Sequence, residues 1–374
     1  MDISSEMIHA LLPLFLMTTL GASAAVVGVI EGIGEATASI VKLFSGWVSD
    51  RIGSRKWLMT SGYALAAATK PIFAFAATPH QVLFARFADR LGKGIRVAPR
   101  DALVADVTPA VVRGEAYGLR QALDTVGAMV GPLTAIVLML AFAGDMRTVF
   151  RWAIVPAIAS VLVAAFAVRE PPRMKTPTEV RAPIRLAAIR DAGAAYWTVV
   201  AIGAVFTMAR FSEAFLLLRG QDVGLAPSYA PTVMVVMNLT FALTSTPAGA
   251  WSDRYDRRRI LAFSLGPLLL ADATLALWSS VFGVVVGVAL WGIHMGMSQG
   301  LLAALVADTV PERQRATAFG VFNFITGVVL FFASFLAGTL WEVFGPAATF
   351  LTGGGFALLG LAGLLMVLRK PRRD

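Results

Sequence analysis

Five basic side chains lie within one otherwise apolar segment, residues 81–107, which is long enough to cross a bilayer as a helix. At about 100° per residue they share one face of such a helix; they are Arg86, Arg90, Lys93, Arg96 and Arg100. Charged side chains are costly in hydrocarbon, so this basic stripe implies a water-filled or protein-lined cavity beside it. Asp89 and Asp101 of the same segment cannot neutralise all five bases. Either acids of other helices or an anionic substrate must therefore balance the stripe.

A second set of ionisable side chains lies on residues 24–49, where Glu31, Glu35 and Lys42 share one helix face. Two interpretations of the acids stay open. They could neutralise arginines of the basic stripe, because buried charges must be paired. They could also carry protons, since a carboxylate desolvated inside a membrane can load and release a proton near neutral pH.

Further candidates for the same cavity lie on other apolar segments. Glu6 on the first segment and Asp124 on the fifth are additional candidate proton carriers. Asp124 is four residues from Arg120 on the same helix face, which favours a static ion pair over proton transfer at that position. The second half of the chain contributes Arg210 and Glu213, and we expect the ionic part of the mechanism to lie on the first, second, fourth and fifth segments.

These side chains must be positioned by membrane-spanning helices. Hydrophobic residues make up 57% of the chain and the mean hydropathy is +0.73, which is too apolar for a soluble domain of 374 residues. We predict an all-α membrane protein with twelve transmembrane helices in two six-helix pseudo-symmetric bundles. The predicted spans are at about 3–20, 24–49, 57–77, 81–107, 114–143, 148–168, 193–218, 226–251, 259–279, 281–307, 315–341 and 346–368.

The net charge of +9 is concentrated in short connections between these spans. The even-numbered connections are basic, so the positive-inside rule predicts that they and both termini are cytoplasmic. No basic-aromatic platform is visible, and we expect no nucleic-acid partner. The chain has no cysteine, and its three histidines show no ligand spacing, so we expect no metal site and no cofactor. We also expect no enzymatic activity, because a membrane enzyme would need a cluster of His, Asp or Ser with catalytic spacing.

A long connection rich in proline and arginine divides the spans six and six, and the two halves repeat each other. Gly46, Asp50 and Arg51 match Gly249, Asp253 and Arg254 at an offset of 203 residues. Parallel copies of a six-helix unit are typical of transporters whose halves rock about a central site. The predicted organisation is an N-terminal bundle at 1–168, a cytoplasmic linker at 169–192, a C-terminal bundle at 193–368 and a cytoplasmic tail at 369–374.

The repeated motif resembles the loop between helices 2 and 3 of the major facilitator superfamily. GWVSDRIGSRK holds that motif's glycine, aspartate, arginine and basic pair, and GAWSDRYDRRR is its degenerate copy, with Asp256 in place of the second glycine. The resemblance implies a gating motif made of Gly46, Asp50, Arg51, Gly53, Arg55, Lys56, Asp253 and Arg254. Asp50 and Asp253 could bind the exposed amides of a neighbouring helix in one conformation only, or they could simply be topology charges in a tight turn.

Two further stretches carry the same resemblance. Residues 90–94, RLGKG, resemble the helix 4 motif, with Lys93 where glutamine is more usual, which implies a structural role for Arg90 and Lys93 and leaves Arg96 and Arg100 for substrate. GAMVGP resembles the helix 5 motif of exporters, although the trailing glycine pair is missing; its residues are Gly127, Gly131 and Pro132.

The residues and the resemblance together predict a secondary transporter that works by alternating access, with a small molecule and protons as partners in a lipid bilayer. We expect proton-coupled export of a small organic molecule by a monomer in a bacterial inner membrane. The basic stripe leaves open proton-coupled transport of an anionic metabolite or metal chelate, and a channel or membrane enzyme is the alternative of a different class. Because the first span is short, we expect the chain to begin inside the true first helix.

Overall fold

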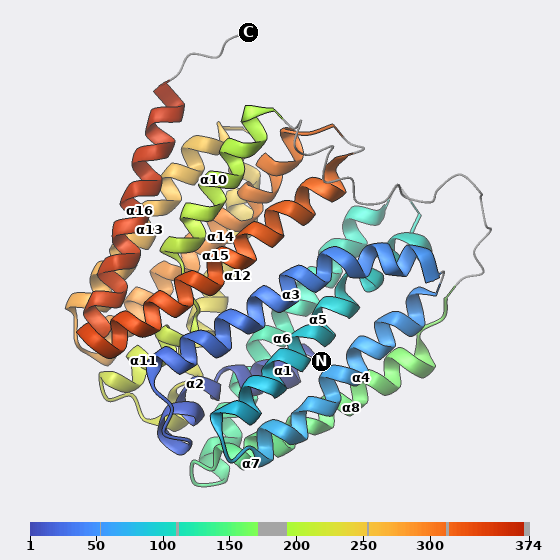
Figure 1. Ribbon diagram of the computed structural model, residues 1–374, viewed down its shortest axis with the longest axis vertical. Helices are drawn as coiled ribbons and strands as arrows, with labels where there is room; N and C mark the ends of the chain where they lie inside the picture. The colour runs from blue at the N-terminus through green and yellow to red at the C-terminus, as the bar shows by residue number, and fades with distance from the viewer. Residues whose placement is uncertain (53, 110–111, 171–192, 253, 312–313, 370–374) are drawn as a thin grey trace.

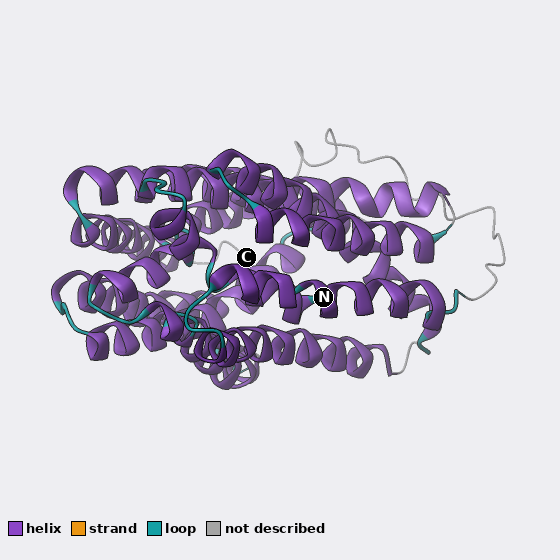
Figure 2. Ribbon diagram, turned by 90° about the horizontal axis from the view of Figure 1, so that it is seen from below, coloured by secondary structure: helices purple, strands orange, loops and turns teal. Residues whose placement is uncertain are grey.

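The computed structural model describes residues 1–52, 54–109, 112–170, 193–252, 254–311 and 314–369. Regular structure within these ranges is entirely helical, as Figure 2 shows. Over the described residues the helices make twelve crossings, six in each half of the chain, so the predicted all-α fold class is confirmed. Gly53 and Asp253 of the predicted motif, most of the linker and the tail after Arg369 lie outside the described residues.

The first six crossings come from the N-terminal half. They are α1 (Asp2–His9) with α2 (Leu12–Leu14) and the π-helix η1 (Phe15–Thr19), then α3 (Ala24–Ile52), α4 (Arg55–Phe75), α5 (Pro79–Val107), α6 (Arg113–Ala141), and finally α7 (Met146–Trp152) with α8 (Ile154–Leu162) and the π-helix η3 (Val163–Ala167). Thr78 caps α5 by accepting a hydrogen bond from the Gln81 amide, and Pro79 follows at the first helical position, where its missing amide costs nothing.

The last six crossings come from the C-terminal half. They are α10 (Ala194–Ala209) with α11 (Ala214–Asp222), then α12 (Thr232–Ser252) after the 3-10 turn η4 (Pro227–Tyr229), α13 (Arg257–Leu277), α14 (Val281–Asp308), α15 (Arg315–Phe344) and α16 (Pro346–Arg369). Gly345 has a φ of 86°, which ends α15 with a glycine in the left-handed region, and Pro346 starts the next helix.

The first crossing is interrupted, although the sequence predicts one continuous span at 3–20. Helix α1 ends at His9, and α2 begins at Leu12 with Pro13 inside its first turn. Proline has no amide hydrogen, so Pro13 cannot donate to the His9 carbonyl and the helical ladder loses that bond at the break. The break places Glu6 and His9 on the last turn of a short helix in the middle of the bundle.

The seventh crossing is interrupted in the equivalent place. Helix α10 ends at Ala209 and α11 begins at Ala214, so residues 210–213 leave the helical ladder. The repeat offset of 203 aligns residues 210–213 with residues 7–10, which adjoin the break of the first crossing at residues 10–11. Interrupted helices at corresponding positions of two halves are a pointer to a transport site.

The two halves meet along a seam between α3 and α15, which lie side by side in the centre of Figure 1. Small residues allow this close approach: a Cβ on Gly28 would lie 2.2 Å from the Ser334 carbonyl oxygen, and one on Gly338 would lie 2.5 Å from that of Ala24. On the opposite side, Asn238 of α12 donates to the Ala128 carbonyl of α6 at 3.2 Å. Contacts between the halves therefore exist on both sides of the space that they enclose.

Inside each half, the fourth crossing packs against the second and the third in the same way. Helix α5 contacts α3 and α4, and α14 contacts α12 and α13. A Cβ on Gly92 of α5 would lie 2.7 Å from the Gly62 carbonyl oxygen of α4. On α14, a Cβ on Gly292 would lie 2.4 Å from the Met237 carbonyl oxygen of α12. Close packing through glycine is thus a feature that the halves share.

Among the described residues, nine helical segments are long and apolar enough to cross a membrane by length and composition alone. The three crossings outside that set are the interrupted first crossing, α4 and α5. All three belong to the N-terminal half and contain charged side chains that are packed against one another. The charged side chains that lower the hydropathy of these three crossings therefore lie together in the N-terminal half.

Candidate functional site

Three adjoining cavities lie between the two halves. The central cavity, of about 270 Å³, is bordered by both helix interruptions and has Glu6, His9, Glu31, Glu35, Arg90, Lys93, Arg210, Ser212, Glu213, Asn238 and Gln299 in its wall. The α6–α12 cavity, of about 220 Å³, adds Asp2, Arg96, Arg100 and Asp124, and the α3–α6 cavity, of about 340 Å³, adds Lys42 and Asp101. Because the three cavities adjoin, the space that they form together suits a small organic molecule.

The structure brings the predicted cavity residues together with one exception. Eleven of the twelve lie in the walls of these cavities, and the twelfth, Arg86, lies behind the wall with only 3% of its surface exposed. Lys93 is in the wall of all three cavities. The basic stripe of α5 therefore faces a protein-lined cavity, as its helical spacing predicts.

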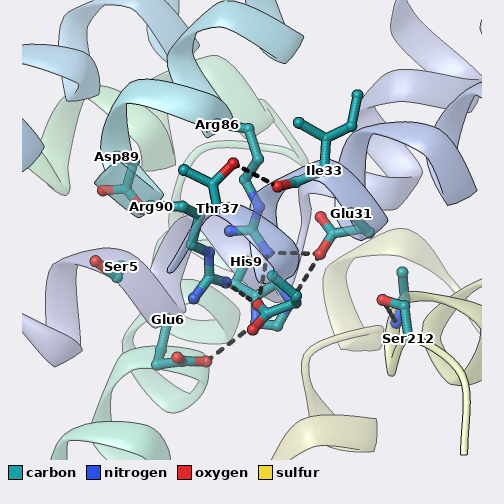
Figure 3. Close-up of polar contacts among 12 residues, drawn as sticks. Ser5, Glu6, His9, Glu31, Ile33, Thr37, Arg86, Asp89, Arg90 and Ser212 are labelled. Carbon is teal, nitrogen blue, oxygen red and sulfur yellow. Dashed lines mark hydrogen bonds and ion pairs between the residues drawn. The ribbon is translucent and has the colours of Figure 1, made fainter. Parts of the chain in front are cut away.

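A buried ionic chain runs from α5 to the break in the first crossing, as Figure 3 shows. Arg86 is 2.5 Å from Glu31, and Glu31 is 3.5 Å from His9 Nε2. His9 Nδ1 lies 3.4 Å from Glu6, which faces the central cavity. Both nitrogens of the His9 ring thus face carboxylates. A histidine in that position can satisfy both acids only when both nitrogens carry protons.

Glu35 is the second acid of α3 that faces the basic stripe. It lies 3.0 Å from Arg90 and 3.9 Å from Arg86. Gly34 makes room for these arginines, because a Cβ there would lie 3.2 Å from the Arg86 side chain. Glu31 and Glu35 therefore do neutralise arginines of α5, which is one of the two interpretations that their spacing allows.

Lys70 of α4 is a member of the ionic cluster that sequence reasoning missed. It is 1% exposed and lies 2.9 Å from Asp89 of α5 and 3.1 Å from the Ser5 hydroxyl of α1. The signal was present in the sequence, because a lone lysine in the middle of an apolar span needs a partner. The buried ionic cluster thus extends to the third crossing, beyond the first, second, fourth and fifth crossings on which the sequence places the ionic part of the mechanism.

The remaining arginines of the stripe are also paired with acids of other helices. Arg96 is 3.7 Å from Asp2 of α1, and its guanidinium stacks on the Tyr63 ring at 5.1 Å. Arg100 lies 3.2 Å from Asp124 of α6, and Arg120 lies 3.0 Å from the same carboxylate, as the i, i+4 spacing predicts. Asp101 also contacts Arg100, at 3.2 Å.

Lys93 differs from the four arginines of the stripe. Within the described part of the chain, no carboxylate lies within 4.0 Å of its amine. Arg210 and Glu213, at the break in the seventh crossing, likewise have no oppositely charged side chain within 4.0 Å among those residues. The sequence led us to expect that Lys93 is balanced and that Arg100 is available to substrate, whereas the structure pairs Arg100 and gives Lys93 no ion pair with any described residue.

The helix 5 motif positions α1 against α6. A Cβ on Gly127 would lie 3.0 Å from Asp2 Cβ, and one on Gly131 would lie 2.7 Å from Glu6 Cβ and 2.8 Å from the Ile3 carbonyl oxygen. Pro132 follows inside α6. The two glycines let the helix carrying Glu6 approach α6 closely, so they act on the cavity through backbone packing.

The predicted gating residues lie at the helix ends remote from the central cavity. Arg55 lies 2.6 Å from Asp106, and Arg257, one residue before the repeat equivalent of Arg55, pairs with Asp308. Glu170, which the sequence did not single out, accepts hydrogen bonds from the first amides of α4, at Arg55 (2.7 Å) and Lys56 (3.1 Å). A carboxylate is favourable at a helix N-terminus because of the exposed amides there.

The other described residues of the gating motif make no ion pair across helices that the structure describes. Gly46 packs against α5, since a Cβ on it would lie 3.6 Å from Ala98, and Arg254 is exposed in the turn after α12. The side chains of Asp50 and Arg51 are outside the described part, so their role as a latch stays a prediction. No group of three His, Cys, Asp or Glu side chains in the described ranges is arranged to hold a metal ion.

The sequence matches the Major Facilitator Superfamily over residues 1–220 and again over 199–374. It is 29% identical over 372 residues to an uncharacterized MFS-type transporter of Methanocaldococcus jannaschii, covering 98% of this chain and 91% of that protein. It is 27% identical over 354 residues to the multidrug resistance protein MdtH of Edwardsiella ictaluri, covering 92% and 84%.

A similar fold occurs in the crystal structure of a mutant form of the nucleoside transporter NupG. The TM-score is 0.83 at 14% sequence identity, with 98% of this chain and 96% of that chain covered. At this identity the likeness concerns the fold alone. The match to the family over residues 1–220 and 199–374 shows that this multi-pass membrane protein belongs to the Major Facilitator Superfamily of secondary transporters.

Proposed function

We propose that this transporter exports a small organic solute in exchange for protons, with Glu6 as the carboxylate that loads and releases the proton. The observation that carries this proposal is the position of Glu6. It faces both the central and the α6–α12 cavities, and over the described residues its one ion-pair partner is His9 at 3.4 Å. A proton carrier must be reachable from water and must not be locked in a strong ion pair.

The other acids of the cluster are held more firmly. Glu31 is 1% exposed and lies 2.5 Å from Arg86, and Glu35 lies 3.0 Å from Arg90. Asp124 contacts Arg100 and Arg120 together. Protonating any of these would leave an arginine without its counter-charge, which is costly in a dry interior. His9 can take part with Glu6, because it links that carboxylate to Glu31.

Alternating access would follow from the way the halves meet. Residues 1–168 and 193–368 would rock as two rigid units about the α3–α15 seam, closing the cavities from one side at a time. We propose that the ends carrying Arg55 and Arg257 face the cytoplasm, because the basic connections lie there, and that one copy of the chain suffices. Export is supported by the helix 5 motif and by the likeness to MdtH, which is named a multidrug resistance protein.

The experiment uses proteoliposomes loaded with the pH indicator pyranine and solutes first selected by thermal-shift screening. Wild-type protein should couple saturable solute flux to a change of internal pH. Glu6→Gln should abolish the proton flux but retain exchange of solute for solute, because the cavity is intact and only the proton site is lost. Export should also lower the accumulation of the solute in cells that express the protein.

Glu115→Gln is the matched control, since Glu115 is an exposed acid near the start of α6 and should leave the coupling unchanged. Solute flux without any pH change in the wild type would contradict proton coupling. A Glu6→Gln protein that still moves protons with solute would contradict the role of Glu6. Flux that does not saturate would indicate a channel.

A further inference from the structure

Most charged side chains around the central cavity already have a partner. Arg90 is paired with Glu35, while Glu31 is shared by Arg86 and His9. In the neighbouring α6–α12 cavity, Arg96 and Arg100 are paired with Asp2 and Asp124. Net positive charge along α5 is therefore not by itself a reason to expect an anion, because acids of α1, α3 and α6 compensate these bases.

Three charged side chains in the central cavity stand apart from this network. Lys93, Arg210 and Glu213 have no ion pair within 4.0 Å among the described residues, and all three are partly buried in the cavity wall. Glu213 can compensate one of the two cations when the cavity loses water. Apart from Glu6, the other cation has no acid left in the described part of the wall, since Glu31 and Glu35 already serve Arg86 and Arg90. Glu6 contacts His9 and, as the proposed proton carrier, has no charge to offer whenever it holds a proton.

Closure of the cavity makes this imbalance matter. An unpaired cation is tolerated in a water-filled cavity, but it is strongly unfavourable once the halves close and water leaves. An anionic ligand removes that cost, whereas a neutral or cationic ligand does not. Two uncharged amides in the same wall, Asn238 and Gln299, can donate further hydrogen bonds to an anion.

Lys93 and Arg210 also come from different halves of the protein. Lys93 is on α5 in the N-terminal bundle, and Arg210 is at the break between α10 and α11 in the C-terminal bundle. A ligand that contacts both cations favours the closed arrangement of the halves, because it is bound best when the two walls are close. Binding and closure are thereby linked through charge.

We propose that the substrate is a small organic anion, and that Lys93 and Arg210 together bind its anionic group in the central cavity. This inference rests on the proposed transport function, and it names the substrate class of that site. It moves the anion contact away from Arg96 and Arg100, which have carboxylate partners, to two cations that have none among the described residues.

The experiment is a thermal-shift comparison of purified protein with matched ligands that differ only in charge. The probes are benzoate, benzamide and benzylamine, and succinate, succinamide and 1,4-diaminobutane. We expect the carboxylates to raise the melting temperature and the amides and amines to have no effect. Lys93→Gln and Arg210→Gln should each weaken carboxylate binding by about tenfold or more, which is the scale of one charge-assisted hydrogen bond.

Two controls keep the result interpretable. Lys42→Gln removes the same charge, but from the wall of the α3–α6 cavity alone. It should change carboxylate affinity by less than about twofold, because salt screens the attraction between Lys42 and a ligand in the central cavity. Lys93→Arg should retain binding, because it keeps a cation at that position. The melting temperature of each variant without ligand reports whether it is folded.

The proposal is overturned if none of the carboxylates stabilises the protein, or if the amides or amines do so equally well. It is also overturned if folded Lys93→Gln and Arg210→Gln proteins bind carboxylates like the wild type. Binding is measured here without any pH gradient. Failure of proton coupling in proteoliposomes would therefore contradict the proposed export mechanism but not the anion site. Proton-coupled flux without carboxylate binding would contradict the anion site but not the export mechanism.

Discussion

The two halves of the transporter are packed alike but charged unlike. Each half has an interrupted first crossing, a fourth crossing packed closely through glycine, and an ion pair between the start of its third crossing and the end of its fourth, Arg55–Asp106 in one half and Arg257–Asp308 in the other. Among the described residues, only the N-terminal half also contains a buried ionic cluster. The shared geometry suits two bodies that rock against each other, and the charges supply chemistry on one side of the site.

The third crossings show the difference most clearly. In α4, Lys70 is buried and paired with Asp89 of α5 at 2.9 Å. In α13, Asp272 occupies nearly the equivalent position, is 1% exposed, and has no hydrogen-bond partner for either oxygen within the described ranges. It lies against Gly353 of α16, whose Cβ would come within 3.2 Å of it. A buried charge is thus compensated in one half, whereas in the other a carboxyl group is buried without such a partner.

Among these variants, Lys70→Met should cause the largest loss in the free energy of unfolding. Lys70→Met leaves Asp89 buried at 4% exposure without its lysine partner, and breaking a buried ion pair in this way costs about 3–5 kcal/mol. We expect that loss in the free energy of unfolding, measured by denaturant titration in mixed micelles. The double variant Lys70→Met/Asp89→Leu should recover most of it, because both charges are then gone. A single variant as stable as the wild type would show that Lys70 is not balanced by Asp89.

The corresponding change in the C-terminal half should have the opposite sign. Asp272→Leu replaces an unpaired carboxyl group by an apolar side chain of similar shape, so the cost of burying a polar group without partners, about 1–3 kcal/mol, is removed. We expect a higher free energy of unfolding in the same titration. If Asp272→Leu instead destabilises the protein, Asp272 has a favourable interaction and the contrast between the third crossings disappears.

The sequence predicted the architecture and much of the cavity because these depend on local patterns. Apolar lengths gave the twelve crossings, and helical spacing placed the five bases of α5 on one face, of which all but Arg86 line the cavities. The interruptions were not predicted, although Pro13 was visible. The mean hydropathy of a segment shows that it is apolar, but it does not show whether each backbone carbonyl finds an amide to accept from.

Pairing across helices could not be read from the sequence, because it depends on which faces meet. Helical angles gave Glu31 and Glu35 a common direction but could not show that Glu31 contacts both Arg86 and His9. The sequence suggested no role for His9, whose position between two acids depends on how α1 packs against α3. For the same reason the sequence could not tell that Lys93, rather than Arg100, is the base without an ion pair among the described residues.

The equivalent ion pairs at the helix ends give the smallest and most direct comparison of the halves. The side chains of Arg55 and Asp106 are 14% and 31% exposed, whereas those of Arg257 and Asp308 are 28% and 56% exposed. Arg55 also donates to the Ala102 carbonyl at 2.5 Å. Arg257→Gln should therefore cost less than about 1 kcal/mol, as exposed pairs do, and Arg55→Gln about 1–2 kcal/mol.

Raising the salt concentration separates these two pairs further. The exposed Arg257–Asp308 pair is screened by salt, so the small loss caused by Arg257→Gln should vanish near 1 M NaCl, where the Debye length is about 3 Å. The loss caused by Arg55→Gln should persist, because its carbonyl contact is short and partly buried. Equal losses for both variants at high salt would mean that the halves are matched at these helix ends in energy as well as in geometry, and the difference between them would then be confined to the buried ionic cluster.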